Sequence, residues 1–262
     1  MNPQPFPLIL CSLILALLSG CASYVTPGGR ADLDAFAPYD IQQGFATEPT
    51  HPFPASIAAV RVQESGYSNY YLSRHGGSYG SGRYSVITIK EVEEQSQLQR
   101  VLSLPQVSGV VSLNRMLLPK QLQGDREIRA AASRLQADLV FLYTFDTQFF
   151  DKDAAKPLTV ITLGFSPTKQ INALTTASAM LLDTRTGYIY AAYETTEREQ
   201  KLATAWSSRE SADRARQETE KRAFAKLVDE FVETWPTIVK KADLTEIAQG
   251  PPSLKTSPVT DP

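Results

Sequence analysis

Residues 173–196 (ALTTASAMLLDTRTGYIYAAYETT) constrain the fold most, because they predict two β-strands joined by a tight turn. Asp183 opens the turn, and Gly187 supplies the positive φ that closes it. A further strand is predicted at 137–147 and a long amphipathic helix at 207–235. Apolar and aromatic residues run through 188–193, with Tyr188, Tyr190 and Tyr193 spread over both faces, so we expect the sheet to be contacted on both sides.

The rest of the chain supplies further strands and helices. Alternation and β-rich composition predict strands at 56–63, 85–89 and 107–118, and helical spacing predicts helices at 91–102 and from Asp125, its expected N-cap. Pro236 is expected to interrupt or restart the long helix. The first half of this helix is expected to carry a charged, solvated face with Glu210–Arg214 and Glu218–Arg222 pairs. We predict a single α/β (α+β) domain: a mixed, mostly antiparallel sheet packed by two or three helices.

The N-terminus predicts a cellular address. Residues 8–18 form an apolar run that is too short to span a bilayer comfortably and is typical of a signal-peptide core. The sequence Leu18-Ser19-Gly20-Cys21 follows and resembles the lipobox of bacterial lipoproteins. The resemblance implies cleavage before Cys21, which would carry diacylglycerol and an N-acyl chain that anchor it in a membrane. With Ala22 and Ser23 after the cysteine, the same resemblance implies transport to the outer membrane. An ordinary secretory signal and an uncleaved anchor are the alternatives.

Composition limits the partners and the chemistry. Lys and Arg (26) nearly balance Asp and Glu (28), so no global field favours nucleic acid. The only other cysteine, Cys11, lies in the signal core, so the mature chain would have no disulfide and no cysteine metal site. We expect a signal peptide at 1–20, a lipidated tether at 21–55 that packs partly on the domain, a periplasmic domain at 56–245, and a disordered tail at 246–262.

Residues 66–84 (GYSNYYLSRHGGSYGSGRY) are rich in tyrosine and glycine. Aromatic side chains among serine and glycine make adaptable contact surfaces, so this segment is either a binding loop or a disordered insertion. Candidate partner contacts are the tyrosines of this loop and of the hairpin: Tyr67, Tyr70, Tyr71, Tyr79, Tyr188, Tyr190 and Tyr193.

Catalytic and metal-binding patterns are not evident in the sequence. His51 and His75 both fall in predicted loops, and no nucleophile elbow, zinc-protease motif or P-loop occurs. Asp146, Asp151 and Asp153 are predicted to lie in a loop region, but they lack the spacing and glycine of a calcium loop. We therefore expect no enzyme, no metal site and no cofactor beyond the acyl chains; an unrecognised hydrolase is an alternative.

Two segments resemble known envelope domains. Residues 128–147 and 181–190 are similar to the helix–strand unit and the hairpin of CsgG-like lipoproteins and TolB amino-terminal domains. The resemblance implies a mixed sheet with helices on one face and a periplasmic interaction role. The expected function is a non-catalytic binding or scaffold domain for an envelope partner, as a monomer or a homo-oligomer. The alternative is a subunit of an oligomeric secretion channel, with residues 158–179 entering the membrane. Residues 158–165 are either a buried strand or a lipid-facing one.

Overall fold

The structure is a computed structural model of the chain, and it describes residues 29–32, 35–36, 41–50, 53–153, 169–203 and 208–249. The predicted signal peptide, the lipidation site Cys21, His51, the segment 158–165 and residues 250–262 lie outside the described residues. Within the described part of the chain, no helix is both long and apolar enough to cross a membrane.

The elements follow one another along the chain as predicted, with some short additions. They are α2 (Ile41–Ala46), β1 (Ala55–Glu64), α3 (Leu72–His75), β2 (Ser78–Tyr79), β3 (Ser81–Gly82), β4 (Tyr84–Ile87), α4 (Glu94–Leu102), β5 (Val107–Ser112), η2 (Arg115–Leu117), β6 (Gln121–Leu122), α5 (Asp125–Arg134), β7 (Leu139–Asp153), β8 (Lys169–Asp183), β9 (Ile189–Ala203) and α7 (Ser208–Gln249). Asp151 and Asp153 therefore belong to a strand, and Asp146 does too, rather than to a loop.

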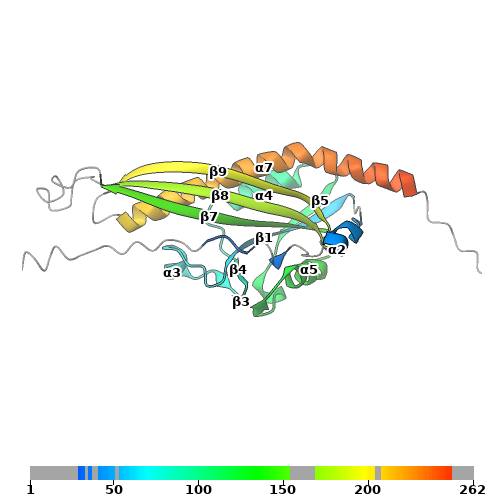
Figure 1. Cartoon of the computed structure of the whole chain (residues 1–262), viewed down its shortest axis with the longest axis horizontal. Helices are drawn as coiled ribbons and strands as arrows, with labels where there is room; N and C mark the ends of the chain where they lie inside the picture. The colour runs from blue at the N-terminus through cyan, green and yellow to red at the C-terminus, as the bar shows by residue number, and fades with distance from the viewer. Residues whose placement is uncertain are drawn as a thin grey trace, which may run out of the picture.

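Seven strands form one mixed, mostly antiparallel sheet in the order β2-β4-β1-β7-β8-β9, with β5 also paired to β1 (Figure 1). The central strand β1 is parallel to β5 and β7 and antiparallel to β4. Strands β7, β8 and β9 are each 15 residues long and antiparallel, so they extend beyond the rest of the sheet. The predicted fold class is confirmed.

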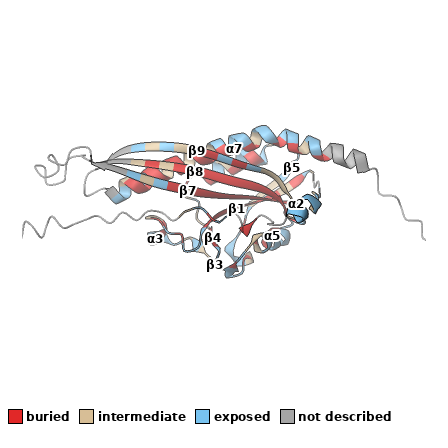
Figure 2. Cartoon of the chain, viewed as in Figure 1, coloured by how far each residue is buried: buried red, intermediate tan, exposed pale blue. Residues whose placement is uncertain are grey.

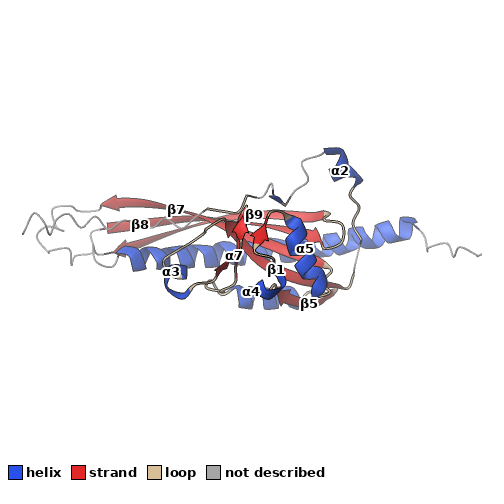
Figure 3. Ribbon diagram, turned by 90° about the horizontal axis from the view of Figure 1, so that it is seen from below, coloured by secondary structure: helices blue, strands red, loops and turns tan. Residues whose placement is uncertain are grey.

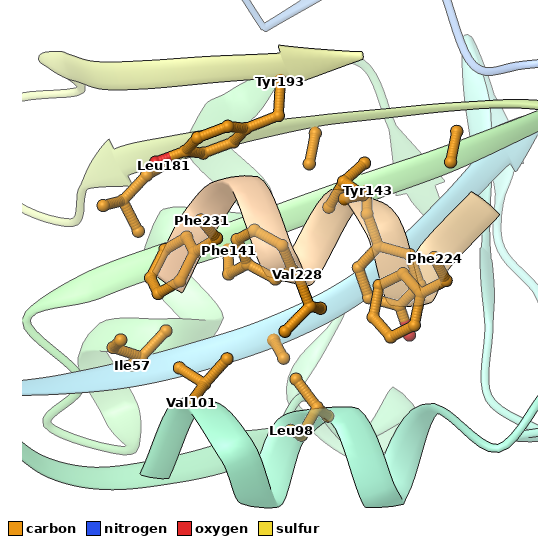
Figure 4. Close-up of a cluster of buried hydrophobic side chains, with 14 of the residues drawn as sticks. Ile57, Leu98, Val101, Phe141, Tyr143, Leu181, Tyr193, Phe224, Val228 and Phe231 are labelled. Carbon is orange, nitrogen blue, oxygen red and sulfur yellow. The ribbon is translucent and has the colours of Figure 1, made fainter. Parts of the chain in front are cut away.

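Helices cover both faces of the sheet, which corrects the expectation of helices on one face. On one face, α4 and α7 pack against β1, β7, β8 and β9 in a cluster that includes Phe141, Phe224 and Phe231 (Figures 1 and 4). On the other face, α5 contributes Ile128 to a second cluster with Leu142 and neighbouring residues. Figure 2 shows that the buried residues concentrate where these layers meet. Because the sheet carries apolar residues on both faces, each face is covered, which gives three layers: helices, sheet and helix.

The hairpin forms as its turn residues predict. Gly187 has φ of 77°, and its N–H donates to the Asp183 carbonyl oxygen. The side chain of Asp183 accepts hydrogen bonds from the N–H groups of Arg185 and Thr186 and from both the N–H and hydroxyl of Thr50. Burial opposes ionisation of Asp183, but these hydrogen bonds lower the pKa of its carboxyl below the ordinary value.

Two predicted helix details are corrected. Helix α7 continues through Pro236 to Gln249. Pro236 is exposed, whereas Trp235 and Ile238 on either side stay in the core, so tertiary packing outweighs the missing backbone hydrogen bond. In α5 the N-cap is Gly124, and Asp125 is the first helical residue. Glu127 accepts the Gly124 N–H at 3.0 Å, which satisfies one of the free donors at this end of the helix.

The predicted tether packs partly on the domain, as expected. Ala31 and Phe36 are buried in the α5-side cluster, and the Phe36 ring lies 4.8 Å from that of Tyr84. Helix α2, by contrast, contains no buried residue, and Figure 3 shows it standing away from the sheet.

Candidate binding surface and the ion network beneath it

The aromatic segment (residues 65–83), which joins β1 to β4, presents aromatic and cationic side chains to solvent. The Tyr71 ring stacks on His75 at a centroid distance of 4.2 Å, and the Arg74 guanidinium lies 4.4 Å from the centre of the Tyr70 ring. Both tyrosines are partly exposed, and Arg74 and His75 are exposed. These four residues, which we call the aromatic turn, form a surface with π faces and positive charge.

Buried residues of the same segment fix the aromatic turn to the sheet. Tyr67 and Leu72 pack against Ile87 of β4 in a small apolar cluster. The buried side chain of Asn69 accepts the Leu72 N–H at 2.7 Å and donates to Glu91 at 3.0 Å. Apolar packing and hydrogen bonds therefore both support the exposed aromatic turn from its buried side.

The second half of the segment is held by short strands. Strand β2 pairs with β4, β3 pairs with β6, and the Tyr79 hydroxyl donates to the Leu118 carbonyl at 3.1 Å. Gly82 has φ of 123°, and a Cβ there would collide with the Leu122 carbonyl oxygen, so this close approach requires glycine. The segment is therefore ordered, which excludes the disordered insertion among the two sequence interpretations.

Beneath the aromatic segment lies a buried ion network that joins β1, α4 and α7. Arg61 of β1 pairs with Glu220 at 3.1 Å, Glu91 at 3.4 Å and Glu94 at 3.7 Å. Arg216 of α7 pairs with Glu91 at 2.7 Å, Glu220 at 2.8 Å and Asp213 at 2.9 Å. Apart from Asp213 at 8%, each of these side chains is 1% exposed.

The network reaches both the aromatic segment and the sheet. The Tyr67 hydroxyl lies 3.4 Å from Arg61, whose guanidinium also stacks 4.6 Å from the centre of the Phe145 ring. Toward the sheet, Thr147 donates to Glu220 at 3.3 Å and lies 2.9 Å from the Thr175 hydroxyl, which donates to Thr219 of α7 at 2.8 Å. The network thus links the candidate binding surface to the long helix.

Burial and charge set the protonation of the network. Burial opposes the charge of Arg61, but Glu220 and the other acidic neighbours raise its pKa above the ordinary value, so it stays charged. Burial raises the pKa of Glu94 and that of Asp213, against the opposing effects of Arg61 and Arg216 respectively. Burial likewise raises the pKa of Tyr67 to about 12, so its hydroxyl keeps its proton at neutral pH.

The seven candidate tyrosines do not gather in one place. Tyr67 and Tyr193 are 3% and 7% exposed, so these two are core residues and do not form a contact surface. Tyr70 and Tyr71 belong to the aromatic turn, and Tyr79 is partly buried.

The hairpin tyrosines differ from the prediction in their placement. Tyr190 and Tyr193 both pack on the α7 side of the sheet, because a register shift at Leu181/Leu182 breaks the alternation. Tyr188 lies edge-to-face with Tyr190 at 5.1 Å and is partly exposed. The expectation that these tyrosines spread over both faces is therefore corrected.

Sequence reasoning missed the ion network, because the charged first half of α7 was expected to face solvent. Arg216 and Glu220 are buried, and Arg222 pairs with Glu197 and Glu199 of β9 instead of Glu218. Two signals were present in the sequence: Arg61 interrupts an apolar strand, and residues 216 and 220 share the helical stripe of residues 212, 219 and 223. The predicted Glu210–Arg214 ion pair is present.

The carboxylates of the described residues are not arranged as a metal site. No group of three or more His, Cys, Asp or Glu side chains there is placed to hold a metal ion. The concentrated carboxylates are those of the ion network, and two guanidinium groups and the surrounding core enclose them.

Comparison with known proteins gives distant structural likenesses. No protein-family model and no curated protein matches the chain. Among solved structures, it resembles a DUF330 protein from Xanthomonas campestris (TM-score 0.35, 12% identity, 76% of this chain and 95% of that one). It also resembles a neuraminyllactose-binding hemagglutinin homologue from Helicobacter pylori (TM-score 0.32, 10% identity, 76% and 93%) and lipoprotein GNA1162 from Neisseria meningitidis (TM-score 0.26, 16% identity, 56% and 85%). These TM-scores are low, so the fold assignment rests on the sheet and helices described above.

Proposed function

We propose that this chain is an outer-membrane lipoprotein, anchored through acyl chains on Cys21, whose periplasmic domain binds an envelope partner without catalysis. The aromatic turn is the proposed contact surface. The observation that carries the binding role is the combination of exposed rings and the Arg74 guanidinium above a buried, hydrogen-bonded support. A preorganised surface loses less conformational entropy on binding than a mobile loop does.

The non-catalytic role is supported by how the ionisable groups are used. Acid–base catalysis needs a titratable group within hydrogen-bond reach of a substrate. In the ion network the carboxylates contact arginine, asparagine or threonine side chains and are nearly inaccessible, so they serve the fold. The exposed His75 stacks on Tyr71 and lies 3.0 Å from the Tyr71 carbonyl oxygen.

Photo-crosslinking in the cells that make the protein tests the contact surface. A photoreactive amino acid at Tyr71 should give a discrete crosslinked product, identified by mass spectrometry, and the same amino acid at exposed Arg214 of α7 serves as the control. Replacing Tyr70 and Arg74 by alanine should reduce the Tyr71 product without lowering the amount of folded protein. Equal crosslinking from the two positions, or an unchanged product in the double variant, would refute the assignment.

Lipidation is tested separately. Cys21→Ser removes the proposed acylation site, so the protein should leave the membrane fraction and appear in the periplasmic extract. Membrane association that is unchanged in this variant would contradict the anchor and leave the contact surface to be judged by crosslinking alone.

A further inference from the structure

The ion network contains more negative than positive charge. Four carboxylates, from Glu91, Glu94, Asp213 and Glu220, surround the guanidinium groups of Arg61 and Arg216. Unbalanced charge at such burial is costly, and proteins reduce that cost by binding a proton. The question is which carboxylate holds it.

Glu94 is the least well hydrogen-bonded of these carboxylates. Its Oε2 accepts the Val92 N–H at 3.1 Å, but its Oε1 has no hydrogen-bond partner and lies 3.7 Å from Arg61. Glu91 and Glu220, by contrast, each accept hydrogen bonds at both oxygens. A carboxylate with an unsatisfied buried oxygen gains most from protonation.

A small polar cavity adjoins Glu94. It has a volume of about 30 Å³, enough for one water molecule, and Arg61, Lys90 and Tyr143 also line it. Burial and Glu94 together raise the pKa of Tyr143 well above its ordinary value, so the hydroxyl is neutral.

Charged or titratable groups from three elements and one loop face Glu94. They are Arg61 from β1, the neutral Tyr143 from β7, Glu220 from α7, and Glu91 and Lys90 from the loop before α4. Arg61 is shared with two other carboxylates, so its charge is only partly available to Glu94.

We propose that Glu94 is a proton-operated latch for the aromatic segment: its carboxyl group holds a proton when the network is closed, and loss of that proton to solvent loosens the segment. Ionised Glu94 competes with Glu91 for Arg61. Glu91 also holds Asn69, and Arg61 holds the Tyr67 hydroxyl, so a shift of Arg61 weakens both supports of the aromatic turn. The inference rests on the proposed function only in taking the aromatic turn as the binding surface.

The sign of the pH effect follows from linkage. Because the pKa of Glu94 is raised in the folded state, the folded protein binds this proton more tightly than the unfolded chain does. The proton's contribution to stability is therefore fully present below the ordinary glutamate pKa. It is lost as pH rises through the raised value.

The test compares wild type with Glu94→Gln, which keeps a neutral side chain at every pH, and with Glu93→Gln, its exposed neighbour. The melting temperature of each purified protein is measured from about pH 5 to about pH 8. Glu94→Gln should gain stability relative to wild type as pH rises, while Glu93→Gln should run parallel to wild type. Amide exchange of residues 65–83, corrected for intrinsic rates, should accelerate with pH in wild type and not in Glu94→Gln.

Parallel profiles for wild type and Glu94→Gln would overturn the latch. If Glu94→Gln does not fold, carbon-13 titration of the Glu94 carboxyl in wild type decides, and a pKa at or below the ordinary glutamate value overturns the proposal. These measurements use the protein without a partner, so failure of the latch is distinguishable from failure of the proposed binding role.

Discussion

The two halves of α7 meet the same sheet in different ways. The first half lies on β7 and β8 through small and polar residues, among them Ala215 and Thr219. Its Arg216 pairs with Glu91 in the loop before α4 and with two carboxylates of α7 itself. The second half packs Phe224, Phe231 and other large apolar side chains against the sheet (Figure 4). The apolar half supplies hydrophobic free energy, which is largely non-directional. The polar half supplies directional contacts and is the half that reaches the aromatic segment.

The largest loss of stability is expected when a buried charged residue in the first, polar half of α7 is replaced. Arg216→Ala leaves Glu91, Asp213 and Glu220 without this cation, so it should lower the free energy of unfolding by about 3–5 kcal/mol. Denaturant unfolding measures the change. Arg214→Ala, which removes an exposed arginine paired with exposed Glu210, should cost less than about 1 kcal/mol. Similar losses for the two variants would show that the polar half is not a buried network.

The apolar half should respond to lost volume and not to pH. Val228→Ala removes two buried methyl groups and should cost about 2 kcal/mol of unfolding free energy. Because Val228 lies in an apolar cluster and the change removes no ionisable group, its cost should be constant across the pH range in which wild type is folded. A cost that varies with pH would mean that the two halves are energetically coupled.

A smaller loss of stability is expected where the sheet meets the first, polar half of α7. Thr175→Val keeps the side-chain shape and removes the hydroxyl that joins Thr147 to Thr219, both of which are buried. The loss should be about 1–2 kcal/mol, and it can be measured by thermal or denaturant unfolding. Serine at the same position, Thr175→Ser, keeps the hydroxyl and should restore most of the hydrogen-bond contribution. Equal losses in the valine and serine variants would assign the effect to packing.

Local sequence signals predicted most of the fold. The Asp183–Gly187 turn and the helical stripe of α7 placed the hairpin and the long helix, because turn chemistry and periodicity act over a few residues. The continuation of α7 past Pro236 was not predictable in this way, because packing of Trp235 and Ile238 decides it. The register shift that puts Tyr190 and Tyr193 on one side likewise depends on strand pairing.

The candidate site was predictable only in part. The tyrosine and glycine content drew attention to residues 66–84, and Tyr70 and Tyr71 lie at the proposed surface. Composition could not show that Tyr67 faces inward, because that orientation depends on Arg61 of β1 and on packing against Ile87 of β4. Charges on a helix predict a solvated face unless their partners are known, so the buried pair Arg216–Glu220 was not predicted, although both residues lie on the apolar stripe of α7.

The central claim is that the buried polar network holds the aromatic turn in one conformation. Amide hydrogen exchange at Leu72, followed by NMR, tests it directly, because the Leu72 N–H donates to the Asn69 side chain, which in turn is held by Glu91. We predict that the Leu72 amide is strongly protected in wild type and exchanges much faster in Asn69→Ala, while the core amides of β7 keep their protection. Exchange at the rate of an unstructured peptide in wild type would contradict the claim.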